Sequence, residues 1–73
     1  MVTEIRTDEL VQIGSVAGMI WHFLDVHGPV TLSKLAKEID APRDAVMQGV
    51  GWLAREGKIR FDETPRSRTI TLA

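Results

Sequence analysis

The chain has 73 residues, no cysteine and a formal net charge of −1. This length allows one domain. The lack of cysteine excludes disulfides and thiolate zinc sites. The net charge alone does not indicate a polyanionic partner. The polar N-terminal residues do not resemble a signal peptide, and the most apolar stretch, residues 10–26, is interrupted by Gln12, Ser15, His22 and Asp25, so we expect a cytoplasmic protein without a membrane span.

The first predicted element is a helix over residues 8–26, preceded by an N-terminal arm of residues 1–7. Apolar residues recur at every third or fourth position of this helix, which is the spacing of one helical face. Its opposite side is also apolar, at Val11, Met19 and Val26. That is more apolar surface than one small core uses. These three side chains are therefore expected either to pack against the arm or to form the seam of a homodimer.

A short extended segment at residues 30–32 leads into a second predicted helix over residues 32–39, with Thr31 or Ser33 as its cap. A turn follows. Pro42 then suits the first position of a third helix, because its fixed φ fits a helix and its missing N–H has no intrahelical partner there.

The third predicted helix runs to residue 56, and Gly57 ends it. Residues 58–61 and 69–72 alternate polar and apolar side chains, as half-buried strands do. The polar segment 62–67, which contains a proline, is expected to be the loop between them. The elements together predict an α+β fold, mainly α, in a single domain that spans residues 1–73.

This order of elements resembles the winged helix-turn-helix superfamily over residues 8–73. The segment from Leu35 to Val46 (LAKEIDAPRDAV) is similar to the helix-turn-helix core of that superfamily, and the segment from Leu53 to Ile59 (LAREGKI) is similar to its passage into the wing. The resemblance implies three helices, a short first strand and a C-terminal two-stranded wing. The length and the two-strand ending also resemble a small stand-alone bacterial winged-helix family of unknown function.

In DNA-binding members of the superfamily, the third helix lies in the major groove and the wing contacts phosphate. Carried over to this sequence, Arg43 and Gln48 suit hydrogen bonds to guanine and adenine. Asp44 would instead repel phosphate, and Met47 and Gly51 have no side-chain donor. The candidate DNA-binding residues are Arg43, Gln48, Lys58, Arg60, Arg66 and Arg68.

The last four of these residues belong to the wing and form its basic part. Residues 31–73 carry eight bases and six acids (8 − 6 = +2), whereas residues 1–30 carry one base and four acids (1 − 4 = −3). This asymmetry favours a basic face near the end of the chain. The alternative is a solvated hairpin whose arginines pair with Asp62 and Glu63, in exposed ion pairs worth about 0–1 kcal/mol each.

Four glycines lie inside predicted helices, at positions 14, 18, 49 and 51. Each costs about 1 kcal/mol relative to alanine. Close helix approach, with Trp21 or Trp52 covering the gap, would explain them, and so would a partner helix lying in a shallow groove. Trp52 falls on the side of its helix away from Val46 and Val50, where it either packs against the wing or anchors an interface.

No catalytic or metal-binding constellation is present in the sequence. His22 and His27 are five residues apart, which does not place them on one helical face, and no His-Glu-x-x-His pattern occurs. Ser15 and His22 share a side of the first helix, but a rise of about 1.5 Å per residue separates them by about 10 Å, too far for a nucleophile and its base. We expect no enzyme activity, no cofactor, no metal and no small-molecule substrate.

The sequence therefore leaves two hypotheses. In the first, the protein binds double-stranded DNA through the third helix and the wing, as a transcriptional regulator would. In the second, the same fold is a protein-interaction module or a homodimer without specific DNA recognition, and its candidate interface residues are Val11, Met19, Val26 and Trp52.

Overall fold

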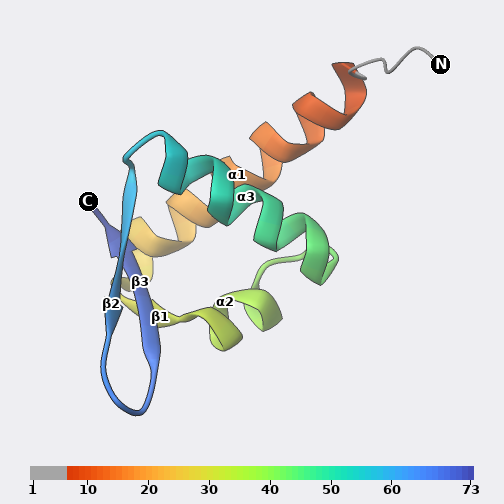
Figure 1. Ribbon diagram of the computed structural model, residues 1–73. Coiled ribbons are helices and arrows are strands. Elements are labelled where there is room, and N and C mark those ends of the chain that lie inside the picture. Colours follow the sequence, from red (N-terminus) through yellow and green to blue (C-terminus); the bar gives the residue numbers. More distant parts are fainter. Residues whose placement is uncertain (1–6) are drawn as a thin grey trace, which may run out of the picture.

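In the computed structural model, the backbone is described for residues 7–73 and the side chains for residues 11–73. Within that part of the chain, three helices and a three-stranded antiparallel sheet form a winged helix-turn-helix fold, as predicted (Figure 1). The elements are α1 (Thr7–His27), β1 (Val30–Thr31), α2 (Leu32–Glu38), α3 (Arg43–Arg55), β2 (Ile59–Glu63) and β3 (Arg68–Leu72). Of the predicted arm, only Thr7 is described, and it belongs to α1; residues 1–6 lie outside the described residues.

The starts of α2 and α3 are capped differently. The Thr31 hydroxyl accepts a hydrogen bond from the Lys34 N–H at 3.1 Å, as expected of a cap. Pro42, predicted as the first residue of α3, instead occupies the cap position before it. Its ψ of 149° is extended, so the helical backbone begins only at Arg43, although the Pro42 carbonyl already accepts from the Val46 N–H at 3.0 Å.

Two glycines with positive φ end the long helices. Gly57, at φ 70°, follows α3, and its N–H donates to the Ala54 carbonyl at 3.0 Å while the Lys58 N–H donates to the Leu53 carbonyl at 3.0 Å. This pair of bonds is the Schellman stop, which suits glycine because a Cβ disfavours the left-handed conformation. It turns the chain from α3 into β2. Gly28, at φ 77°, ends α1 in a similar left-handed conformation.

The sheet has the order β1-β3-β2, so the last strand lies in the middle. The hairpin of β2 and β3, residues 59–72, is the wing, and it projects past the body of the molecule (Figure 1). Its strands run farther toward the tip than predicted, because Asp62 and Glu63 still pair in register with Thr69 and Arg68. Only residues 64–67 remain as the loop.

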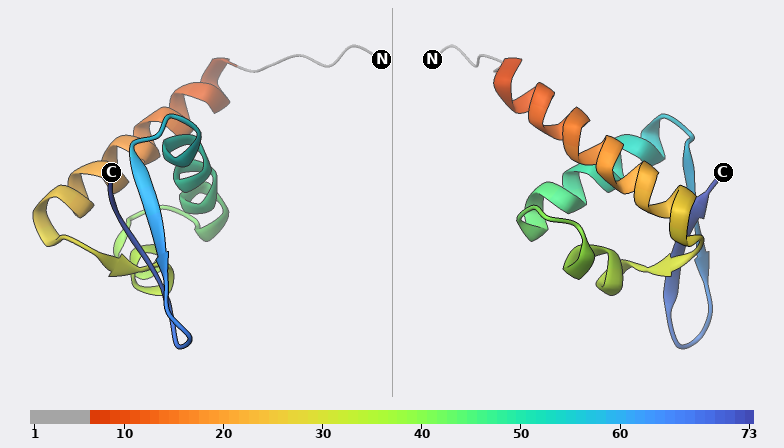
Figure 2. Two further views of the ribbon diagram at one scale, coloured as in Figure 1. Left: turned by 60° about the vertical axis from the view of Figure 1, so that its left-hand side comes forward. Right: turned by 180° about the vertical axis from the view of Figure 1, so that it is seen from behind.

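The expectation of a half-buried β2 is wrong for most of its length. Ile59 is buried, but every later residue of β2 is exposed, and Phe61 keeps 41% of its surface accessible. The polar–apolar alternation of residues 58–61 is real, but the wing extends beyond the helices that would cover its inner face (Figure 2).

The core lies where α1 crosses α3 and where the sheet closes against them. Figure 2 shows the crossing from two sides, with the first turns of α1 projecting beyond it. At this point a Cβ added to Gly49 would lie 2.9 Å from Ile20 Cδ1 and 3.2 Å from the Ala17 nitrogen. The buried apolar residues are Val16, Ala17, Ile20, Leu24, Val30, Leu35, Ile39, Val46, Val50, Leu53, Ile59 and Ile70.

Close helix approach therefore explains one of the four helix glycines. A Cβ added at Gly14, Gly18 or Gly51 would meet no atom within 4 Å, so packing within the chain does not require glycine at those positions. Among the described residues, no helix combines the length and apolar character needed to cross a membrane.

Candidate nucleic-acid interface

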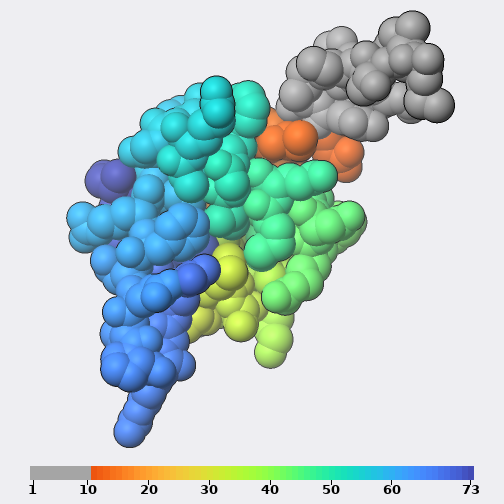
Figure 3. Space-filling view, in the orientation of Figure 1, coloured from red at the N-terminus to blue at the C-terminus, as the bar shows by residue number. Residues whose placement is uncertain are grey.

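The face of α3 opposite the core is open to solvent. The buried residues of α3 point into the core instead; they are Val46, Gly49, Val50 and Leu53. Arg43 and Gln48 are exposed, and so are Asp44 and Gly51, while Met47 is half-buried. Figure 3 shows α3 and the wing together on one face of the molecule, with the wing extending beyond the body.

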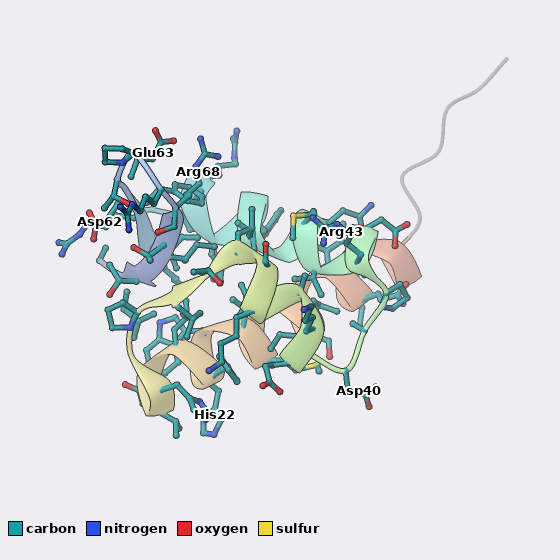
Figure 4. The ribbon with its side chains drawn as sticks, turned by 90° about the horizontal axis from the view of Figure 1, so that it is seen from below. His22, Asp40, Arg43, Asp62, Glu63 and Arg68 are labelled. Atoms are coloured by element: carbon teal, nitrogen blue, oxygen red, sulfur yellow. The ribbon has the colours of Figure 1, made fainter. Side chains whose placement is uncertain are left out.

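The two candidate base-reading residues point to different sides of α3. Gln48 lies in a shallow hollow with Gln12 and Ile13 of α1, and Arg43 is not part of that hollow. At 3.6 residues per turn, side chains five positions apart diverge by about 140°. Figure 4 places Arg43 along the same edge of the molecule as Arg68 and Glu63 of the wing. The structure thus brings Arg43, but not Gln48, to the side of the wing.

Three of the four basic wing candidates are engaged in ion pairs. The Arg68 guanidinium donates to the Glu63 carboxylate, with Nε 2.8 Å from Oε1, and its Cζ lies 5.9 Å from the centroid of the Phe61 ring. Arg60 Nε lies 3.7 Å from Asp62 Oδ1. The arginine pairing that the sequence left open is therefore present for both of these arginines.

Lys58 is paired as well, with its Nζ 3.7 Å from Glu56 Oε1. All three pairs are exposed, where such pairs are worth about 0–1 kcal/mol each. Among the described residues, Arg43 and Arg66 are the two basic candidates that form no ion pair. These two candidates therefore keep a positive charge that no carboxylate of the described chain pairs.

Trp52, a candidate interface residue, is exposed near α1. It is 41% exposed and lines a hollow between α1 and α3, together with the 40% exposed Trp21. Gly14 and Gly18 contribute to the same hollow from α1, and Lys58, just before β2, lines its far end. Trp52 thus lies in one hollow with Trp21, a residue that the sequence did not indicate as part of an interface.

The other interface candidates lie along the exposed side of α1. Val11 is 65% exposed, Met19 37% and Val26 63%. Met19 and Val26 line a second apolar hollow with Phe23 and with Glu38 and Asp40 at the end of α2. The spacing of Met19, Phe23 and Val26 is visible in the sequence. The placement of Glu38 and Asp40 beside them is not, because it depends on how the chain folds back to bring the end of α2 near α1.

The titratable residues of the described chain do not gather into a metal centre. No group of three or more His, Asp or Glu side chains is arranged there to hold a metal ion. The one ordered contact of a histidine is His27, whose ring stacks on Phe23 with centroids 4.1 Å apart.

Comparison with known proteins gives a family and several related folds. Residues 7–72 match the family model described as winged helix-turn-helix domain (DUF2582). The solution NMR structure of protein BT2368 from Bacteroides thetaiotaomicron is 28% identical, with a TM-score of 0.74 over 84% of this chain and 74% of that one. No curated protein matches the chain.

Two further solved structures have a similar fold. The crystal structure of an ArsR family transcriptional regulator is 25% identical, with a TM-score of 0.61 over 97% of this chain and 77% of that one. HlyU from Vibrio cholerae is 17% identical, with a TM-score of 0.60 over 97% of this chain and 82% of that one. At that identity, HlyU supports the fold alone.

Proposed function

The chain belongs to the winged helix-turn-helix domain (DUF2582) family, and on this premise we propose that it is a regulator that binds double-stranded DNA through α3 and the wing. The ArsR family regulator of similar fold supports this assignment. The observation that carries it is the position of Arg43 and Arg66, which form no ion pair and belong to the two elements that meet DNA in this fold.

The proposed binding is electrostatic and of modest affinity. Each phosphate neutralised on duplex DNA contributes about −0.9 to the slope of log K against log salt. Two unpaired arginines give a slope of about −2. Arg60, Arg68 and Lys58 add little as long as they stay with their carboxylates.

The proposed binding discriminates weakly between base sequences. Gln48 is turned toward α1, so of the two side chains suited to base edges only Arg43 faces the DNA. Asp44 is exposed beside it, and its charge disfavours close contact with phosphate. We therefore expect random-sequence DNA to compete well with any particular site.

An NMR titration of the full chain with a random-sequence DNA duplex tests the proposal. At low salt, amide shifts confined to α3 and the wing are expected, and they should fade as salt rises. The double variant R43A/R66A should bind at least tenfold more weakly. R55A removes the same charge from the last turn of α3 and is the matched control, with an affinity within about twofold of the original.

A second candidate function is self-association or protein binding along α1. Residues 10–24 contain no Asp, Glu, Lys or Arg, and within this run Val11 and Met19 stay exposed. Interface cores are depleted of charged residues in the same way. Sedimentation at rising protein concentration tests for a homodimer, which G18R should disrupt. A chain that stays monomeric at millimolar concentration would exclude self-association by this route.

A further inference from the structure

We propose that the hollow between α1 and the end of α2 docks a segment of another protein that carries an apolar side chain next to a lysine or arginine. This α1–α2 hollow has an apolar floor, formed by Met19, Phe23, Val26 and Ile39, and its acidic rim is formed by Glu38 and Asp40. The two histidines, His22 and His27, complete the lining. The proposal concerns a different surface from the DNA-binding face and does not depend on DNA binding.

The floor is apolar and already ordered. Met19, Phe23 and Val26 follow one another at i, i+4 and i+7, so they form one stripe of α1. The Phe23 ring stacks on the His27 ring, and His27 Nδ1 lies 3.1 Å from the Phe23 carbonyl oxygen, which fixes the aromatic part of the floor. Val26 nevertheless remains 63% exposed, so this stripe has apolar surface that nothing in the described chain covers.

The rim is negative and has no internal counter-charge. Glu56, Asp62 and Glu63, near the wing, are all in ion pairs, whereas Glu38 and Asp40 form none with the described residues. Glu38 is also the last residue of α2, where the helix dipole disfavours a carboxylate. A lysine or arginine of a partner would pair with these carboxylates and offset the unfavourable interaction of Glu38 with the helix dipole. This charge complementarity selects a basic segment as the occupant.

The two carboxylates also argue against a nucleic acid or a second copy of this chain as the occupant of the hollow. A nucleic acid would meet two carboxylates. A second copy docked symmetrically would bring a patch with the same two carboxylates to the interface and no added lysine or arginine, because a twofold interface joins identical patches. The hollow, of about 370 Å³, lies at the lower end of the roughly 300–1,000 Å³ typical of binding pockets. It therefore suits one or two anchoring side chains.

The hollow lies on the side of the molecule away from the proposed DNA-binding residues. In Figure 4, His22 and Asp40 lie along the edge of the molecule opposite Arg43 and Arg68. His22 belongs to the lining of the α1–α2 hollow, so this edge marks its position. A regulator built in this way holds DNA on one face and a protein partner on the other.

The test is an NMR titration of the full chain with three synthetic helical peptides of equal length. The first carries leucines on one face with arginines beside them, the second replaces the arginines with glutamates, and the third replaces the leucines with serines. We expect the first peptide to shift the amides of residues 19–27 and 38–40, with a dissociation constant below millimolar. The other two should bind at least tenfold more weakly.

Two variants and a matched control locate the binding. The double variant E38Q/D40N should weaken the arginine peptide at least fivefold, and V26S at least threefold. D44N removes another exposed carboxylate, from α3, and should leave the affinity unchanged. All of these positions are exposed, so each variant should stay folded, with a change in stability of at most about 1 kcal/mol from the charges at the helix ends.

Several results would overturn the proposal: equal binding of the glutamate peptide, an affinity unchanged in E38Q/D40N, or no shift at several millimolar arginine peptide. Concentration-dependent shifts of residues 19–27 and 38–40 without any peptide would also overturn it, because they would make a second copy the occupant.

Discussion

The α1–α3 crossing and the wing are held together by different forces. At the crossing, apolar side chains meet at van der Waals distance and Gly49 leaves room for Ile20 and Ala17. In the wing, every residue of β2 after Ile59 is exposed, and backbone pairing with β3 and surface ion pairs maintain the hairpin. Changes at the crossing should therefore alter stability, and changes in the wing should alter binding with little effect on stability.

The largest effect is expected at the crossing. Gly49→Val places a branched side chain where even a Cβ lies 2.9 Å from Ile20 Cδ1 and 3.2 Å from backbone. Overpacking of this kind costs about 3 kcal/mol. Urea unfolding should show the loss as a lower midpoint. A variant as stable as the original would mean that α1 and α3 do not approach this closely.

The neighbouring glycine of the same helix should respond in the opposite direction. A Cβ at Gly51 would meet nothing within 4 Å, so Gly51→Ala gains the helix propensity of alanine, about 1 kcal/mol. The same unfolding experiment measures it. A destabilised Gly51→Ala would show that this glycine is needed within the fold after all.

The smallest effect on stability is expected in the wing. Glu63→Gln removes the carboxylate that holds Arg68, an exposed pair worth about 0–1 kcal/mol, so the unfolding midpoint should scarcely move. The freed Arg68 is then available to DNA. The affinity for duplex DNA should rise about threefold, and the slope of log K against log salt should become steeper by about 0.9.

Glu56→Gln is the control for that change, because it frees Lys58 at the base of the wing instead of Arg68 near its tip. Its effect on DNA affinity should be smaller. Equal affinities for the original chain and Glu63→Gln would show that Arg68 does not reach DNA.

Local chemistry allowed much of the fold to be predicted. The apolar spacing of α1, the Thr31 cap and the Gly57 stop each depend on a few neighbouring residues, and the structure has all three. Helical spacing also places Gly49 on the inward face with Val46 and Leu53, and Gly51 outside it. How closely α1 approaches Gly49 could not be predicted in this way, because it is decided by the packing of a distant segment.

In the candidate site, too, features that depend on contacts between distant segments could not be predicted from the sequence. The sequence supplied the basic residues but left their pairing open, and the pairing of Arg68 follows from the strand register, which sets Glu63 opposite it. The exposure of Phe61 also follows from the reach of the wing, since its alternating pattern alone predicted burial. The acidic rim of the α1–α2 hollow forms only when the packing of α2 on α3 and the sheet brings Glu38 and Asp40 near α1.

The salt dependence of duplex DNA binding tests most directly whether α3 and the wing bind DNA. Fluorescence anisotropy of a labelled random-sequence duplex, measured with the original chain, R43A and R66A, gives the three slopes. We expect a slope of about −2 for the original chain, and each substitution should make the slope shallower by about 0.9. No binding at low salt, or a slope that neither substitution changes, would contradict DNA recognition by α3 and the wing.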